Sequence, residues 1–229
     1  MNSPIILALD TKDPNQARNW IKISRPLINH FKIGLEFYLL NGKESVVALQ
    51  KEFSFELFLD LKLYDIPNTV KGAVESVASL NPKFLTVHAA GGPKMIAAAA
   101  EALPGGSIAA VTVLTSFSEN EFSSLGYSKD ISSTARSWAD KAVAAGATSL
   151  ICSPFEAQQM KDIAPDSTII TPGVRLLGES ANDQNRVMTP KEALSGGADY
   201  VVIGRSITSL SGDSEQAMQD KITEIHQSI

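Results

Sequence analysis

Short apolar runs and segments with helical spacing alternate along the chain. Runs rich in Val, Ile, Leu and Phe predict strands at residues 5–9, 31–34, 56–61, 84–88, 108–114, 149–152, 168–171 and 200–203. Apolar residues three and four apart predict helices at residues 15–27, 36–51, 70–80, 94–103, 134–145, 156–163, 190–195 and 215–225. Strand and helix repeated in this way are typical of α/β folds, so we expect a single-domain (β/α)8 (TIM) barrel over residues 1–229.

An open, doubly wound sheet shows the same alternation and is the structural alternative. Such sheets more often have about six strands. No Gly-x-Gly-x-x-Gly follows the first apolar run, as it does in the dinucleotide-binding versions of that fold. The barrel is therefore the preferred prediction, and it directs attention to polar residues at the C-terminal ends of the strands.

Charged residues interrupt the third apolar run and follow it. Asp60 and Lys62 lie two residues apart, so on a strand their side chains point to the same side. Asp65 falls at the corner between this strand and the next helix, because Pro67 suits a first helical turn. A solvated strand end with an incidental ion pair is the plain alternative for Asp60 and Lys62 taken alone.

Two other predicted strands carry charge near their ends. Lys32 lies within the second apolar run, and a buried lysine is costly unless it is paired. Its natural partner is Asp60 on the next strand. Asp10 ends the first run, where capping of the following helix is the plain alternative to a role in binding.

The segments after the seventh and eighth predicted strands have the features of a phosphate site. Gly173 and Arg175 follow the seventh strand, and Gly204 and Arg205 follow the eighth. Barrel phosphate sites are characteristically built from these two loops. Glycine allows a close approach of the backbone, and the guanidinium group offers two parallel hydrogen bonds.

Composition narrows the classes of protein. Hydrophobic residues make up 44% of the chain and charged residues 20%, which is typical of a soluble globular domain. The net charge of −5 argues against a nucleic-acid partner, and no apolar run approaches the length of a membrane span. Residues 1–4 show no basic start of the secretory kind, so we expect a cytoplasmic protein.

Metal-binding patterns are absent from the sequence. Cys152 is the only cysteine, which excludes an internal disulfide and favours a small buried side chain. The histidines at positions 30, 88 and 226 are separated from one another and from any carboxylate pattern typical of a metal site. His88 closes the fourth predicted strand, where a structural role is the more common one. We therefore expect no metal.

The residues from Asp60 to Thr69 read Asp-x-Lys-x-x-Asp-Ile-Pro-Asn-Thr. This string resembles the signature of the orotidine 5′-phosphate decarboxylase family, whose members convert orotidine 5′-phosphate (OMP) to UMP and CO2 without a cofactor. The resemblance implies a Lys–Asp–Lys–Asp charge array of Lys32, Asp60, Lys62 and Asp65, in which Lys62 protonates the pyrimidine carbon. It extends over nearly the whole chain, from Asp10 to Arg205.

The resemblance also implies roles in substrate binding and assembly. Asp10 and Lys32 would reach the ribose, and a hydroxyl after the fifth strand would contact the pyrimidine ring, at Thr115 or instead at Ser116 or Ser118. An ordinary Ser- and Thr-rich loop that caps the next helix is the alternative there. A homodimer is implied in which Asp65 and Thr69 reach the partner's site. The phosphate-binding positions implied by the family are Arg175, Gln184, Gly204 and Arg205.

Two rival functions remain open from the sequence. A sugar-phosphate decarboxylase of the same superfamily also has Asp-x-Lys on its third strand but uses Mg²⁺, and residues 65–69 speak against it. A non-catalytic barrel that binds a phosphate ligand would contain the same charges as a structural network.

Overall fold

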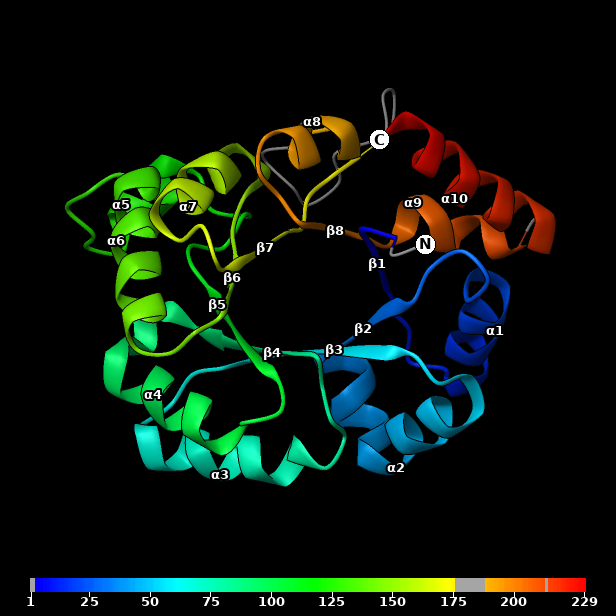
Figure 1. Ribbon diagram of the computed structural model, residues 1–229, viewed down its shortest axis with the longest axis horizontal. Coiled ribbons are helices and arrows are strands. Elements are labelled where there is room, and N and C mark those ends of the chain that lie inside the picture. Colours follow the sequence, from blue (N-terminus) through cyan, green and yellow to red (C-terminus); the bar gives the residue numbers. More distant parts are fainter. Residues whose placement is uncertain (1–2, 176–187, 213) are drawn as a thin grey trace.

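The eight strands of the computed structural model, which describes residues 3–175, 188–212 and 214–229, form one closed parallel barrel in chain order (Figure 1). The predicted (β/α)8 fold is thereby confirmed. The barrel closes where Ile5 to Leu7 pair with Val201 to Ile203. The strands are β1 Ile5–Ala8, β2 His30–Gly34, β3 Glu56–Leu63, β4 Phe84–His88, β5 Ser107–Val111, β6 Ser149–Ile151, β7 Thr168–Thr171 and β8 Tyr200–Ile203.

Helices surround the barrel on its outer side (Figure 1). Proline stands in the first turn of α1, α3, α4 and α8, where its missing N–H leaves no helical bond unmade. Among the helices in the described part of the chain, none has the length and apolarity that a bilayer crossing requires. The α-helices are α1 Pro14–Ser24, α2 Leu35–Phe53, α3 Pro67–Ala78, α4 Gly92–Ala102, α5 Glu119–Ser124, α6 Ile131–Ala144, α7 Ala157–Ile163, α8 Pro190–Ser195, α9 Arg205–Thr208 and α10 Glu215–Ser228.

The alternation of side chains along each strand separates two apolar regions. Ile5 and Leu7 of β1 belong to the large core cluster that packs between the barrel and the helices. Ile6 and Ala8 belong to a second cluster inside the barrel, with residues such as Phe58 of β3. Cys152, the only cysteine in the sequence, is buried, as predicted. Asp60 and Lys62 are two and four residues beyond Phe58 on β3. Their side chains therefore point to the same side as Phe58, into the mouth of the barrel.

Two strand ends differ from the prediction by two residues or more. β3 continues to Leu63 instead of ending at residue 61, and its register against β4 shifts between Leu59 and Leu63. β5 ends at Val111 instead of residue 114, because its neighbour β6 has only three residues to pair with. The last backbone bond between them runs from Thr112 N to Ile151 O at 3.0 Å.

The segment between β5 and α6 contains the short helix α5. Ser118 caps this helix, and Glu121 bonds back to the Ser118 backbone N–H at 2.9 Å. This is a capping box, which the Ser-x-x-Glu spacing indicates in the sequence. No helix was predicted here, because six residues are too few to show an apolar period.

Candidate active site

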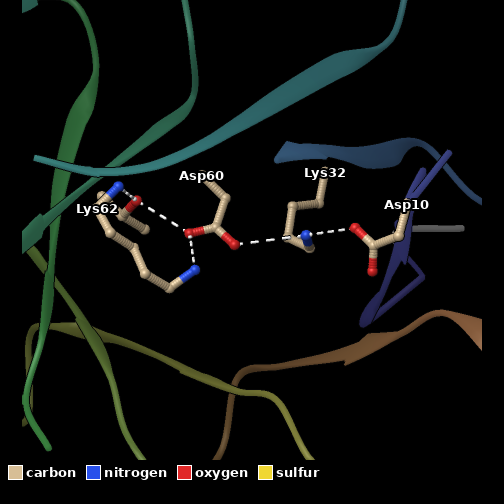
Figure 2. Close-up of polar contacts among 5 residues, drawn as sticks. Asp10, Lys32, Asp60 and Lys62 are labelled. Atoms are coloured by element: carbon tan, nitrogen blue, oxygen red, sulfur yellow. Dashed lines mark hydrogen bonds and ion pairs between the residues drawn. The ribbon is translucent and has the colours of Figure 1, made fainter. Parts of the chain in front are cut away.

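A row of four side chains with alternating charge lies at the mouth of the barrel, and we call Asp10, Lys32, Asp60 and Lys62 the charge array (Figure 2). Lys32 Nζ lies 2.9 Å from Asp10 Oδ1 and 3.4 Å from Asp60 Oδ2. Lys62 Nζ lies 2.7 Å from the other oxygen of Asp60. The predicted pairing of Lys32 with Asp60, and the shared side of Asp60 and Lys62, are both confirmed.

The interior members of the charge array stay charged despite burial. Burial by itself lowers the pKa of Lys32, but the Asp60 and Asp10 carboxylates outweigh it and hold that pKa above its ordinary value. Burial by itself raises the pKa of Asp60, but the ammonium groups of Lys32 and Lys62, with hydrogen bonds from Lys62 and Thr86, hold it below its ordinary value. Lys32 and Asp60 therefore present fixed charges at neutral pH.

The backbone at Lys62 departs from regular strand geometry. Its φ angle of 48° lies in the left-handed region, which for a residue other than glycine costs of the order of 1–3 kcal/mol. The Lys62 N–H donates to the hydroxyl of Thr86 at 2.8 Å, and that hydroxyl donates to Asp60 Oδ1 at 3.0 Å. Sequence reasoning missed Thr86, although its place between Phe84 and His88 on the inward face of β4 marks it as a polar residue in the barrel.

The charge array lines a cavity of about 180 Å³ together with apolar residues that include Leu35 and Phe37. A larger hollow of about 450 Å³ opens at the opposite end of the barrel, beside Thr168 and Tyr200. We place the site at the smaller cavity because it combines converging charges with the C-terminal ends of the strands.

Asp65 and Thr69 lie apart from the charge array of their own chain. Both side chains are exposed, Asp65 in the loop after β3 and Thr69 in the first turn of α3. Asp65 Oδ1 accepts a bond from the N–H of Ile66 at 2.6 Å. Within the described residues, no ion pair joins Asp65 to Lys32 or Lys62. The expected four-charge array of Lys32, Asp60, Lys62 and Asp65 is thus not assembled in a single chain, where Asp10 holds the fourth place.

The predicted phosphate residues lie after β7 and β8. Gly173 has a φ angle of 80°, which favours glycine, and two residues later Arg175 donates from Nη1 to Val174 O at 2.8 Å. Gly204 precedes α9, in which Arg205 is the exposed first residue. Gln184 lies outside the described residues.

The three hydroxyl residues expected near the pyrimidine ring follow β5. Thr115 is half-buried and Ser116 is exposed. Ser118 Oγ lies 2.7 Å from Glu121 Oε2 and also accepts the Glu121 N–H at 3.3 Å. The capping role that the sequence left open is therefore confirmed for Ser118.

His88 and the possible metal ligands were also located. His88 is half-buried beside the charge array, and burial, then Lys62, lowers its pKa against the opposing effect of Asp60. Across residues 3–175, 188–212 and 214–229, no three or more His, Cys, Asp or Glu side chains are grouped so that they could hold a metal ion.

Comparisons with known proteins show the family of this chain. The family model described as "Orotidine 5'-phosphate decarboxylase / HUMPS family" matches residues 3–220. The chain is 50% identical over 209 residues to the orotidine 5′-phosphate decarboxylase of Thermobifida fusca, covering 91% of this chain and 90% of that protein. It is 42% identical over 218 residues to the enzyme of that name from a Wolbachia of Culex pipiens, covering 94% and 96%. The crystal structure of the Lactobacillus acidophilus enzyme superposes with a TM-score of 0.83 at 30% identity, covering 98% of this chain and 99% of that one.

Proposed function

The chain belongs to the orotidine 5′-phosphate decarboxylase / HUMPS family, and from that premise we propose that it converts OMP to UMP and CO2 in pyrimidine biosynthesis. The observation that carries the proposal is the charge array, which sits in the cavity at the C-terminal ends of β1 to β3. The names of the relatives supply the substrate, and the array supplies a chemical reason for the reaction.

Loss of CO2 from C6 of the pyrimidine breaks a carbon–carbon bond and leaves its electron pair on C6. That pair lies in an orbital orthogonal to the ring π system, so resonance does not spread the charge. A cation already fixed beside C6 stabilises the developing carbanion without reorganisation at the moment of reaction. Lys62 fits this role because Asp60 holds its ammonium group at 2.7 Å while about a third of the side chain remains exposed.

Lys62 also completes the reaction by giving a proton to C6, after which it regains a proton from solvent. Asp60 orients Lys62, and Lys32 pairs with Asp60 and extends toward the ribose. Asp10, more than half exposed at the edge of the cavity, accepts hydrogen bonds from the ribose hydroxyls. Thr115 is the proposed contact to the pyrimidine ring.

The proposed phosphate-binding residues are Arg175, Gln184, Gly204 and Arg205, and Gly204 follows β8, which pairs with β1. The two described arginines follow neighbouring strands, and planar guanidinium groups match phosphate oxygens. Because the phosphate is remote from C6, its binding energy is available to the transition state only through closure and orientation of the substrate.

Absorbance spectroscopy tests the function directly. OMP is added to the protein with EDTA present, and we expect the spectrum to change to that of UMP. Turnover of a keto-sugar phosphate only when Mg²⁺ is added would select the sugar-phosphate decarboxylase. No turnover of either substrate would favour a barrel that only binds a phosphate ligand.

We further propose that two chains form a two-fold dimer in which Asp65 and Thr69 complete the partner's site. Four apolar side chains are 63–77% exposed at the same end of the barrel: Leu39, Leu40, Tyr64 and Ile66. They lie in α2 and the loop after β3, on either side of Asp65. A second copy would cover this face and bring Asp65 to a neighbouring charge array, where it would crowd the departing carboxylate.

Subunit mixing tests the shared site. Asp65→Ala and Lys62→Ala chains, each inactive, are dissociated gently and reassociated together. Half of the dimers are then mixed, and one of their two sites combines intact Lys62 with intact Asp65. We expect about a quarter of the parent activity to return.

The matched control mixes Lys62→Ala chains with Asp60→Ala chains. Asp60 and Lys62 belong to the charge array that a single chain forms, so neither residue can be supplied by the partner. In a mixed dimer of that pair, one site lacks Lys62 and the other lacks Asp60. No site is complete, so no activity should return. If the first mixture also stays inactive while subunit exchange is verified by mass, Asp65 serves its own chain.

A further inference from the structure

Thr86 forms a closed set of hydrogen bonds with two members of the charge array. Its hydroxyl accepts the N–H of Lys62 at 2.8 Å and donates to Asp60 Oδ1 at 3.0 Å. The same Asp60 oxygen accepts the Lys62 ammonium group at 2.7 Å. Both ends of Lys62, its backbone amide and its Nζ, are thereby held relative to one carboxylate oxygen.

Burial and its two hydrogen bonds orient the Thr86 hydroxyl. The residue is fully buried on the inward face of β4. A hydroxyl group has a single proton, so accepting the Lys62 amide leaves that proton for Asp60. The bond also supplies an acceptor for a backbone N–H at the point where the β3 and β4 ladder shifts register and Lys62 turns into the left-handed region.

We propose that Thr86 is a positioning residue that sets the direction of the Lys62 side chain for decarboxylation. The proposal rests on the proposed function for its kinetic consequence only. Thr86 does not touch the reacting carbon: it fixes the backbone from which Lys62 extends and the carboxylate that Lys62 meets. A small rotation at either point moves Nζ away from C6. Misplacement of a reacting group by about 1 Å can be costly to a reaction that depends on preorganised charge.

Two substitutions separate the hydroxyl from the shape of the side chain. Thr86→Val keeps the volume and branching but removes the hydroxyl, and Thr86→Ser keeps the hydroxyl. Thr112→Val is the matched control, since Thr112 is also buried and its hydroxyl donates to the backbone oxygen of Ile151 at 3.1 Å. Thr86→Ala replaces the valine variant if that chain does not fold.

We expect Thr86→Val to lower kcat for OMP by about tenfold or more, from the loss of a hydrogen bond to a charged group, with a much smaller change in KM. Thr86→Ser should retain kcat close to that of the parent, as should Thr112→Val. A valine variant with the parent's kcat would overturn the proposal, and so would a serine variant as impaired as the valine one.

Amide hydrogen exchange at Lys62 gives a readout that does not depend on catalysis. In Thr86→Val the Lys62 N–H should exchange faster than in the parent, whereas in Thr86→Ser it should remain protected. Equal protection in the parent and the valine variant would contradict the proposed positioning. If the parent does not convert OMP, the proposed function fails, yet the exchange measurement still decides whether Thr86 holds Lys62.

Discussion

His30 and Lys32 are two residues apart on β2, face the same barrel interior, and meet opposite electrostatic surroundings. Both are nearly inaccessible, at 3% and 9% exposure. Lys32 has carboxylates at 2.9 and 3.4 Å, whereas neither ring nitrogen of His30 has a hydrogen-bond partner within the described chain. Accordingly the pKa of Lys32 is raised, while burial, followed by the charge of Lys83, lowers that of His30.

The difference shows how one barrel separates charge from packing. At the C-terminal end, buried charges are kept by pairing each with the opposite sign, which preserves an electrostatic site at the expense of desolvation. Toward the N-terminal end, His30 packs against Tyr200 with ring centroids 4.8 Å apart and is kept neutral. Barrel enzymes commonly place chemistry at the first end and stability at the second.

Substitution of Lys62 tests this division most strongly. Lys62→Ala removes the proposed proton donor and the cation nearest the carbanion, so kcat for OMP should fall by at least about 10³-fold. UMP binding, measured by calorimetry, should persist because Asp60 keeps Lys32 as a partner. His30→Leu, the variant at the other end of the barrel, should leave kcat unchanged.

Either of two results would contradict the division. Appreciable decarboxylation by Lys62→Ala would show that another group protonates C6. A fall in kcat for His30→Leu comparable to that of Lys62→Ala would show that the aromatic end of the barrel takes part in the chemistry.

Asp60→Asn tests the same comparison through stability. Asp60 accepts from both lysines of the charge array, so a neutral amide leaves two ammonium groups close together in a buried site. We expect the free energy of unfolding at neutral pH to fall by about 3 kcal/mol. This is the lower end of the range for breaking a buried ion pair, because Lys32 still has Asp10 as a partner. Urea denaturation measures this change.

Glu52→Gln is the control for Asp60→Asn. Glu52 pairs with Arg18 at 2.8 Å, but both side chains are nearly half exposed, so loss of this ion pair should cost less than about 1 kcal/mol.

Because the folded pKa of Asp60 is lowered, the stabilisation from the Asp60 carboxylate is present above the unfolded pKa of 3.8 and is lost as pH falls through the folded pKa. The gap between the parent and Asp60→Asn should therefore persist at neutral pH; equal stabilities there would refute the pairing argument.

The charge array was predictable where it depends on strand periodicity. The two-residue spacing gave the common side of Asp60 and Lys62, and the cost of burying Lys32 pointed to Asp60 as its partner. Contacts that depend on register were not predictable. Thr86 lies level with Asp60 in the register that pairs Phe58 with Phe84, and it reaches the Lys62 N–H because that register shifts between Leu59 and Leu63. Nothing local marks Lys62 for a left-handed backbone, since that region is ordinarily signalled by Gly, Asn or Asp.

Loops and short elements were harder to predict than the barrel. The end of β5 depends on the length of β6, which is information from another part of the chain. The link between Asp10 and Lys32 likewise required the β1 and β2 register, whereas the resemblance had suggested only a ribose contact for Asp10. Eight repeated strand and helix signals, by contrast, support one another and made the closed barrel the consistent solution.

The smallest expected effect is the pH dependence that His30 contributes. Its folded pKa is lowered by burial and by Lys83, against the opposing charge of Glu56, relative to 6.5 in the unfolded chain. The unfolded state therefore binds more protons below pH 6.5, and the stabilising effect of neutral His30 is present above that pH and is lost as pH falls. Between about pH 7.5 and about pH 5.5 the loss amounts to at most about 1.4 kcal/mol.

His30→Leu should remove this contribution, so the variant should lose less stability than the parent over the same pH interval in urea denaturation. His226→Asn is the control, because His226 is only partly buried and has Ser3 Oγ 2.7 Å from its Nε2. Its pKa is lowered by burial as well, so its removal should act in the same direction but less strongly. If His30→Leu and the parent lose equal stability on acidification, His30 is protonated inside the barrel, and the contrast with Lys32 does not hold.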